Sequence, residues 1–163
     1  MEDCIICTRE EFLYPMECTH KFCLQCIKGC CITTGACPYC RNVFSDTYKE
    51  NIMNNPGEIY NIGNAITDQI TAMFSRYPAL YVYEGRIGGF WLFAELTQID
   101  LLAAEQNGEL TLDTLLCGQM VTIDLAAGIQ RNQTTHAVRK IHKVHNNTAA
   151  IKGIAGMARN TAP

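Results

Sequence analysis

The fold of the first part of the chain is decided by three short stretches: Cys4-Ile-Ile-Cys7, Cys18-Thr-His20-Lys-Phe-Cys23-Leu-Gln-Cys26 and Cys37-Pro-Tyr-Cys40. Two-residue gaps let a tight turn direct both flanking side chains at one metal ion, and zinc prefers four nitrogen or sulfur ligands in a tetrahedron. Eight ligands therefore predict two zinc sites. Because four protein ligands leave no position for water, both ions are predicted to be structural.

Zinc is predicted to replace a hydrophobic core in this part of the chain. Residues 1–44 lack long apolar periods, and each structural zinc site can contribute roughly 10 to 16 kcal/mol of apparent folding free energy. Nine of the ten cysteines lie before residue 41. A disulfide scaffold would require an exported protein, and the first residues lack the basic-then-apolar order of a signal peptide. The ligand spacing by itself allows either sequential or interleaved pairing.

Charge is distributed as unevenly as cysteine. All 16 acidic residues precede residue 125, whereas 6 of the 13 Lys and Arg residues follow it, although the net charge of the chain is only −3. A cationic C-terminal end favours a polyanionic partner, and a solvated basic tail is the alternative. No apolar run approaches the roughly 18 residues that a membrane-spanning helix needs. We therefore expect a soluble protein located in the cytoplasm, the nucleus or both.

Composition divides the chain into three predicted segments: a zinc finger over 1–44, a linker with a helix over 45–78, and a second domain over 79–159. Apolar side chains recur every three to four residues over 59–74, which predicts the linker helix there. Alternating runs after residue 79 predict strands and one helix, so the fold class is α+β. The predicted elements are strands over 80–83 and 90–93 joined by a turn over 85–89, a helix over 97–106 with Thr97 or the residue beside it as its N-cap, and strands over 119–125 and 136–145.

The order and gaps of the eight ligands resemble the RING finger of E3 ubiquitin ligases. This resemblance implies interleaved ligation, with one zinc ion held by Cys4, Cys7, Cys23 and Cys26 and the other by Cys18, His20, Cys37 and Cys40. It also implies that Ile6, Pro38 and Arg41 contact a ubiquitin-conjugating enzyme (E2). The Arg41 guanidinium, a planar fork of five donors, suits carbonyl groups of E2 and ubiquitin together. Ordinary loop packing is the alternative role of Ile6 and Pro38, and Cys30 and Cys31 are predicted to be small buried apolar residues.

A second series of motifs follows: Tyr81-Val-Tyr-Glu-Gly-Arg-Ile-Gly-Gly-Phe-Trp91, Asp124-Leu-Ala-Ala-Gly-Ile-Gln130, Arg139-Lys-Ile and Lys152-Gly-Ile-Ala-Gly. This series resembles the WWE domain, and together with the finger it is similar to the Iduna-like family of RING-type ubiquitin ligases that depend on poly(ADP-ribose). The resemblance implies a half-barrel-like antiparallel sheet with one helix. The chain departs from the family pattern at Tyr81, at Leu102, at an extra glycine in the hairpin, and at Val121, where the family has a ligand-binding tyrosine.

The WWE resemblance implies a ligand, iso-ADP-ribose, which is the internal unit of the polymer. Arginine and lysine can neutralise its phosphates, aromatic rings can lie against its base or sugars, and a glutamine amide can pair with an adenine edge. For Tyr83 and Trp91 taken alone, packing in the core is the alternative role. The implied contacts are Lys28, Tyr83, Arg86, Trp91, Gln130, Arg139 and Lys152.

Taken together, these resemblances lead us to expect an E3 ubiquitin ligase that binds poly(ADP-ribose) and promotes ubiquitin transfer from E2 to poly(ADP-ribosyl)ated proteins. Binding of the polymer is expected to activate the RING finger. The chemistry would be aminolysis of a thioester on E2, to which this chain contributes no nucleophile. Two alternatives are a non-catalytic binder of the polymer and a zinc-dependent nucleic-acid binder. We expect E2, ubiquitin and modified proteins as partners, and neither a membrane nor nucleic acid.

Overall fold

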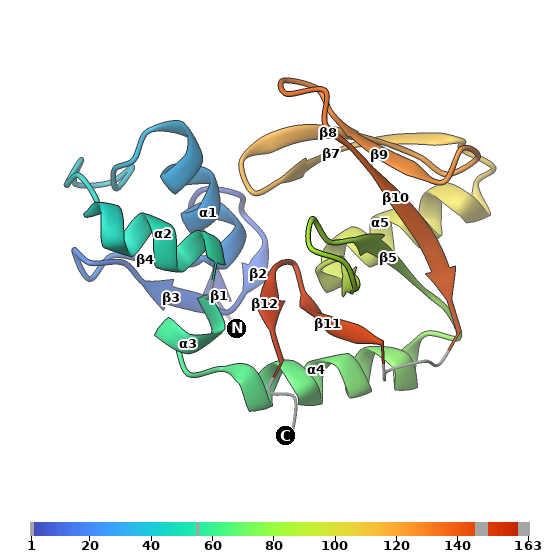
Figure 1. Ribbon diagram of the computed structural model, residues 1–163, viewed down its shortest axis with the longest axis horizontal. Coiled ribbons are helices and arrows are strands. Elements are labelled where there is room, and N and C mark those ends of the chain that lie inside the picture. Colours follow the sequence, from blue (N-terminus) through green and yellow to red (C-terminus); the bar gives the residue numbers. More distant parts are fainter. Residues whose placement is uncertain (1, 55, 146–149, 160–163) are drawn as a thin grey trace.

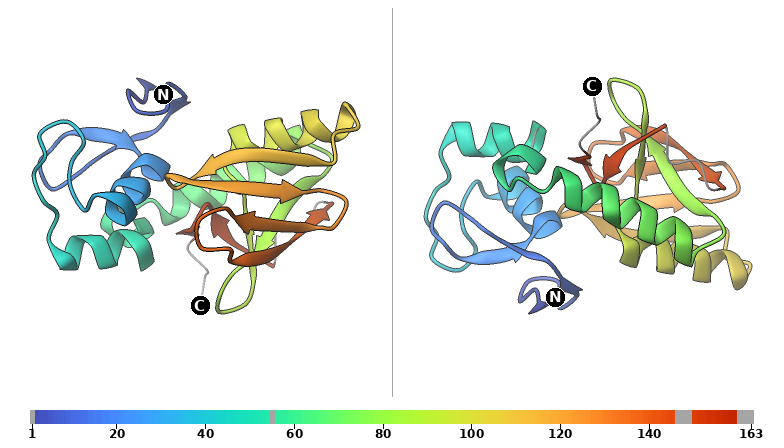
Figure 2. Two further views of the ribbon diagram at one scale, coloured as in Figure 1. Left: turned by 90° about the horizontal axis from the view of Figure 1, so that it is seen from above. Right: turned by 90° about the horizontal axis from the view of Figure 1, so that it is seen from below.

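The computed structural model describes residues 2–54, 56–145 and 150–159. Two bodies lie side by side, a small finger built by the first part of the chain and a larger curved sheet built by the second part (Figures 1 and 2). Helix α4 runs along one side of the sheet after the chain leaves the finger (Figure 1). None of the described helices is both long enough and apolar enough to span a membrane.

The finger contains two small antiparallel sheets and one helix: β1 (Glu2–Asp3), β2 (Glu10–Glu11), β3 (Leu13–Pro15), β4 (Lys21–Cys23) and α1 (Leu24–Thr33). Its buried cluster mixes cysteines with a few apolar side chains, among them Phe22 and Ile27. Cys30 and Cys31 are partly buried and pack against this cluster. The apolar core of the finger is therefore small, as its composition predicts.

The segment after the finger contains three helices, α2 (Asp46–Asn54), α3 (Pro56–Ile59) and α4 (Gly63–Arg76), in place of the single predicted helix over 59–74. The predicted start at residue 59 is wrong because Asn61 has a φ of 50°, in the left-handed region, which interrupts the helical path. Helix α2 was not predicted. Asp46 in its first turn and the Lys49 ammonium 2.6 Å from it are its local stabilising signals.

The connecting helices are divided between the two bodies. Ile52 of α2 is fully buried in the finger cluster, and the Tyr60 hydroxyl donates to the Pro15 carbonyl at 3.1 Å. Helix α4 places Ile66, Ile70 and Met73 in a different cluster, which belongs to the sheet. The finger and the sheet therefore have separate cores, and the short segment between α3 and α4 connects the two bodies.

The larger body is an eight-stranded sheet with the order β12-β11-β6-β5-β10-β9-β8-β7. All its pairs are antiparallel except β11 with β6, so the sheet is the expected antiparallel one with a single parallel pair near its edge. Strand β10 pairs with β9 over Val138–Lys140 and with β5 over Ile141–Val144, which joins the two halves of the bent sheet (Figure 1). Its strands are β5 (Leu80–Glu84), β6 (Phe90–Leu92), β7 (Thr111–Leu116), β8 (Gln119–Asp124), β9 (Ile129–Asn132), β10 (Val138–Val144), β11 (Ile151–Ile154) and β12 (Met157–Ala158).

The single helix of this body, α5 (Glu95–Gln106), begins earlier than predicted. Ala94 is its N-cap residue, and Thr97 is fully buried inside the first turn, so the predicted capping role of Thr97 is wrong. The next residue, Gln98, accepts from the Tyr81 backbone N–H at 2.8 Å and donates to the Tyr81 carbonyl at 2.5 Å. This side chain thus bonds the backbone of β5 as a neighbouring strand would, and it fixes α5 on the sheet.

Candidate functional site

The eight predicted zinc ligands form two groups in the finger. One group contains Cys4, Cys7, Cys23 and Cys26, the other contains Cys18, His20, Cys37 and Cys40, and the ligand atoms within each group all lie within 4.8 Å of one another. The groups are interleaved along the chain, which is the arrangement that the RING resemblance implies. Four sulfur or nitrogen atoms at this separation fit the tetrahedral coordination of zinc, so each group could hold one ion.

Backbone geometry explains how the short loops present their ligands. Thr8, Thr19 and Arg41 each directly follow a ligand and have φ values of 56°, 69° and 61°, which turn the chain sharply. The Cys23 backbone N–H donates to the Cys4 sulfur at 3.4 Å, a bond that links two members of the same ligand group. A bound zinc ion would cross-link chain segments up to 22 residues apart, since Cys4 and Cys26 belong to one group.

The three predicted E2 contacts lie on the outside of these loops. Ile6, in the first loop, is 42% exposed, and Pro38 and Arg41 are exposed at the last loop. Beside Pro38, the Tyr39 ring lies 4.7 Å from the ring of the ligand His20. All three side chains are therefore accessible to a partner protein.

A cavity of about 510 Å³ lies where the finger meets the sheet. This volume is typical of small-molecule sites, which range from roughly 300 to 1,000 Å³. Five of the seven predicted ligand contacts line it: Lys28 from the finger and Tyr83, Arg86, Gln130 and Arg139 from the sheet. One cavity therefore brings together residues that are more than 100 positions apart in the sequence.

The other two predicted contacts, Trp91 and Lys152, are not among the residues that line this cavity. Both lie beside the hairpin between β5 and β6, Trp91 in β6 and Lys152 in the paired strand β11. Trp91 pairs with Tyr83 across the strands, and its indole nitrogen stands next to Gly85, where an added Cβ would be only 2.7 Å away. The aliphatic part of Lys152 covers Gly89, where an added Cβ would lie 2.3 Å from its Cε atom. Both side chains thus shape the hairpin that carries Arg86.

The electrostatic character of the cavity suits an anion. Its lining includes three cations and, within the described part of the chain, no acidic residue. Lys28 is only 4% exposed, burial lowers the pKa of its ammonium, and its Nζ donates to the Ala155 carbonyl at 3.3 Å. The Arg139 guanidinium lies 5.7 Å from the centre of the Tyr83 ring, and burial raises the pKa of that phenol.

One buried polar atom in this lining has no partner. Gln130 is nine-tenths buried, and its Oε1 atom makes no hydrogen bond to any described residue. A buried acceptor without a donor costs on the order of 1 to 3 kcal/mol, which a ligand that donates a hydrogen bond would recover. Gln130 therefore marks a position where a ligand amino or hydroxyl group fits.

The finger contributes more of this cavity than sequence analysis predicts. Gln25, Lys28 and Ile32 lie at positions i, i+3 and i+7 of α1, so one face of the helix lines the cavity, and Met53 and Asn54 join from the end of α2. The helical spacing was available in the sequence, but nothing in it indicates that this face meets the sheet. Val121, at 5% exposure, also lines the cavity.

Close packing holds the finger against the sheet beside this cavity. A Cβ added at Gly118, in the β7–β8 turn, would lie 2.6 Å from the Cα of Gly29 in α1. Next to this contact the Cys117 backbone N–H donates to the Gln25 side chain at 3.3 Å. An ion pair between Arg9 and Asp100, at 3.7 Å, adds a more exposed contact between the two bodies.

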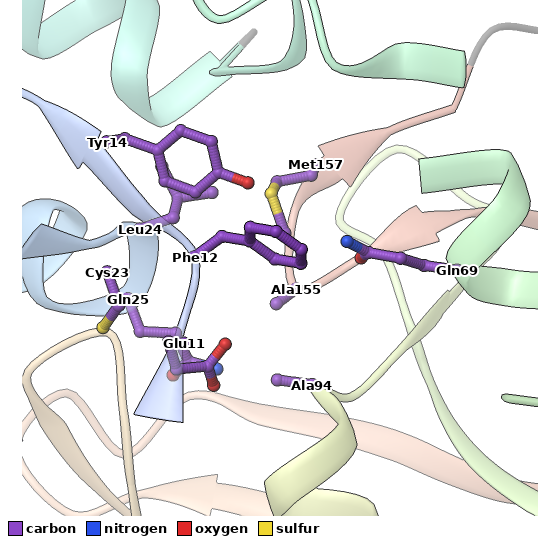
Figure 3. A pocket seen from close by; sticks show the side chains of 10 residues that line it. All are labelled: Glu11, Phe12, Tyr14, Cys23, Leu24, Gln25, Gln69, Ala94, Ala155 and Met157. Atoms are coloured by element: carbon purple, nitrogen blue, oxygen red, sulfur yellow. The ribbon is translucent and has the colours of Figure 1, made fainter. Parts of the chain in front are cut away.

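A second, smaller cavity of about 40 Å³ lies at the same junction (Figure 3). Figure 3 shows side chains of the finger, such as Phe12 and Tyr14, facing Ala155 and Met157 of the sheet. The space suits at most a few water molecules. The larger cavity is therefore the candidate ligand site.

Comparisons with known proteins agree with these features. Residues 79–143 match the family described as WWE domain. The chain is 27% identical over 164 residues to E3 ubiquitin-protein ligase rnf146 of Salmo salar, with 98% of this chain and 43% of that protein covered. It is also 27% identical to the proteins of that name from Danio rerio over 164 residues (99% and 43% covered) and Rattus norvegicus over 159 residues (95% and 42% covered).

The chain spans less than half the length of these curated relatives. Over that span it has the same two parts that the sequence motifs predict, a cysteine-rich group that fits a zinc RING finger and a WWE domain. The resemblance to WWE-containing RING-type proteins is confirmed.

Proposed function

We propose that this chain, a WWE-containing relative of RING-type E3 ubiquitin ligases, promotes ubiquitin transfer from E2 to poly(ADP-ribosyl)ated proteins. The observation that carries the proposal is the shared cavity, whose wall is built from one face of the finger helix α1 and from the inner face of the WWE sheet. A ligand in this position contacts both bodies together, so binding of the polymer stabilises their mutual arrangement.

The lining suits iso-ADP-ribose group by group. Lys28, Arg86 and Arg139 supply positive charge for its phosphates, and the phosphate draws Lys28 toward its charged form. The unpartnered Gln130 oxygen fits the amino group of an adenine. Tyr83, whose ring lies under the Arg139 guanidinium, lines the cavity beside the expected place of the sugar or base. Trp91 and Lys152 remain predicted contacts through the hairpin, for a ligand that extends past Arg86.

Coupling to the E2 surface follows from the position of α1. The helix begins directly after Cys23 and carries Cys26, and both cysteines belong to the ligand group of the Cys4–Cys7 loop that bears Ile6. The same helix presents Gln25, Lys28 and Ile32 to the cavity. A ligand that fixes α1 therefore fixes the loop that Ile6 uses to contact E2. Linkage requires the reciprocal effect, in which E2 strengthens polymer binding by the same factor.

The chain acts on the reaction by position alone. A substrate amine attacks the thioester carbonyl that links ubiquitin to the E2 cysteine, an amide bond forms and the E2 thiolate leaves. Ile6 and Pro38 would hold E2, and Arg41 would donate hydrogen bonds to E2 and ubiquitin together, which restricts the thioester to reactive orientations. Two zinc ions, held by the interleaved groups, would supply structural cross-links.

We also propose the division of the chain into a RING finger over 1–44, a linker over 45–78 and a WWE domain over 79–159. Its location would be the cytoplasm, the nucleus or both, where poly(ADP-ribosyl)ated proteins, E2 and ubiquitin are available together.

A reconstituted ubiquitination assay with E2, ubiquitin and a poly(ADP-ribosyl)ated protein tests the proposal. We expect ubiquitin chains whose rate of formation rises when polymer is present. Arg139→Ala should weaken polymer binding roughly 10- to 100-fold, because one charge-assisted phosphate contact is lost. Lys140→Ala is the matched control, since Lys140 is the next residue of β10 and lies on the opposite face of the sheet.

Three outcomes separate the hypotheses. No ubiquitin transfer in the presence or absence of polymer would contradict a ligase, while intact polymer binding in the same preparation would favour a non-catalytic binder. Equal affinity for iso-ADP-ribose and for an oligonucleotide of the same charge, with steep salt dependence, would favour a nucleic-acid binder. Preference for iso-ADP-ribose that Arg139→Ala abolishes would support the proposal.

A further inference from the structure

The cavity extends beyond the predicted ligand contacts into a second region lined by neutral polar side chains. We call this region the amide arm and define it by Asn54, Gln119, Asn132 and Thr135. Asn54 ends helix α2 on the finger side, and the other three residues come from β8, β9 and the loop after β9. None of them is a predicted contact of iso-ADP-ribose, and none carries charge.

Strand register places the amide arm beside the predicted contacts. Arg139 and Gln130 are directly opposite each other on β10 and β9. Asn132 lies two residues further along β9 on the same face, about 7 Å from Gln130 at 3.3 to 3.4 Å per residue. Val121 is paired with Asn132, and Gln119 lies two residues before Val121 on β8. The cavity therefore continues from Gln130 toward the β7–β8 turn over a distance that fits one phosphate and one sugar ring.

The hydrogen bonds of the amide arm leave donors available. Asn132 is committed, because its Nδ2 donates to Gln119 Oε1 at 2.7 Å and its Oδ1 accepts from the backbone N–H groups of Thr134 and Thr135. The first of these bonds fixes the Gln119 carboxamide by its oxygen. Within the described part of the chain, the Gln119 amide nitrogen makes no hydrogen bond, and neither does the Asn54 side chain. Such neutral amide groups suit sugar hydroxyls, which donate and accept, whereas phosphate is better served by the cations near Gln130.

The passage between the two regions is bordered by Val121. Its side chain is almost fully buried and lies between the Gln130 position and Gln119 on the inner face of the sheet. A valine here is apolar and small, so it leaves the cavity continuous. A much larger side chain at this position would divide the cavity in two.

We propose that the amide arm is a second sugar subsite, which binds the ribose across the phosphate that adjoins the bound iso-ADP-ribose unit. This inference rests on the proposed function of the cavity. The chain then binds the polymer more tightly than its isolated internal unit. Gln119 and Asn54, which are outside the predicted contacts, provide this preference.

Calorimetry of the full chain tests the subsite with two ligands, iso-ADP-ribose and a two-unit ADP-ribose oligomer. The oligomer contains one internal ribose–ribose linkage, so no statistical factor enters the comparison. We expect the wild-type chain to bind the oligomer roughly tenfold more tightly, the gain of one or two neutral hydrogen bonds. Gln119→Leu should remove most of this gain and leave the affinity for iso-ADP-ribose within about twofold.

Two further variants complete the experiment. Val121→Tyr should close the passage and also abolish the gain, by steric exclusion rather than by loss of a donor. Gln133→Leu is the matched control, because Gln133 is exposed and its amide bonds Thr122 on the other face of the sheet; it should retain the full gain. Zinc content and the thermal unfolding midpoint verify that each variant is folded.

Equal wild-type affinity for the two ligands, or a gain that survives both Gln119→Leu and Val121→Tyr, would overturn the subsite. Neither result affects the proposed function, which requires only that iso-ADP-ribose binds. Failure of the wild-type chain to bind iso-ADP-ribose would instead contradict the proposed function itself, together with the subsite that depends on it.

Discussion

The finger and the sheet are held together by different physical means. Four of the nine buried residues in the finger cluster are cysteines that belong to the two ligand groups. The two buried clusters of the sheet contain no cysteine and consist of aliphatic and aromatic side chains. A metal bound by these groups would complete the interior of the finger, whereas the sheet is stabilised by burial of apolar surface.

This difference matters because the candidate site belongs to neither body alone. The cavity lies between helix α1, which carries the candidate ligands Cys23 and Cys26 at its start, and a sheet that has its own apolar core. Metal loading would therefore affect one wall of the cavity and not the other wall. Separate perturbation of the two bodies, and then of their contact, tests this division.

Zinc removal is the perturbation with the largest expected effect. A chelator should cost the finger on the order of 10 kcal/mol or more of folding free energy per site, and residues 2–44 should become sensitive to protease. The sheet should remain folded. Trp91 is the single tryptophan of the chain and lies in β6, so its fluorescence reports on the sheet alone. A chelator-induced shift of its emission to that of the unfolded chain would contradict the independence of the two bodies.

The reverse perturbation removes apolar volume from the sheet. Ile123 is fully buried in one of the sheet clusters, so Ile123→Ala should lower its free energy of unfolding by about 2 to 5 kcal/mol. Denaturant unfolding followed by Trp91 fluorescence measures this loss, and two zinc ions per chain should still be bound. Ile87→Ala is the control, since Ile87 is 93% exposed and should change stability by less than about 0.5 kcal/mol. Loss of zinc from Ile123→Ala would show that the finger depends on the sheet.

The contact between the bodies is tested at Gly118. An added methyl group would overlap the Gly29 backbone, and Gly118 also has a φ of 72°. Gly108 offers a matched control because it has a φ of 73° with no atom within 4 Å of an added Cβ. Gly108→Ala should cost about 1 kcal/mol from backbone strain alone, and Gly118→Ala should cost about 1 to 3 kcal/mol more from the overlap. Equal losses of unfolding free energy for the two variants would mean that the finger does not press on this turn.

Sequence patterns predicted the parts of the molecule whose signals are local. The eight candidate ligands are separated by short fixed gaps, and the structure gathers them in the two groups that were expected. The turn at Gly88 and Gly89 needs the positive φ that glycine adopts readily, and it was also predicted. Strands β7, β9, β11 and β12 were missed because these short segments show no clear alternation of apolar and polar residues. The helix start at Thr97 was wrong because the buried hydrogen bonds of Gln98, not a capping hydroxyl, position α5.

The cavity was beyond sequence prediction for a different reason. Seven of its expected contacts came from family resemblance, and five of them line it, but the contribution of Gln25, Asn54 and Gln119 depends on how two bodies dock. The docked arrangement includes a close Gly29–Gly118 contact between positions 89 residues apart, and neither glycine carries a side-chain signal. Local sequence patterns therefore do not predict how separately folded parts of the chain pack against each other.

The smallest effect is expected at the second contact between the two bodies, the ion pair of Arg9 with Asp100. Its atoms are 3.7 Å apart and the side chains are 35% and 45% exposed, so water and salt screen most of the attraction. Arg9→Ala should lower stability by less than about 1 kcal/mol, and a double-mutant cycle with Asp100→Ala should show a coupling energy that decreases further at high salt. A coupling above about 2 kcal/mol would mean that the finger is oriented by charge. A weak coupling beside a large Gly118→Ala effect would mean that close backbone packing, which salt cannot screen, fixes the wall that the finger adds to the cavity.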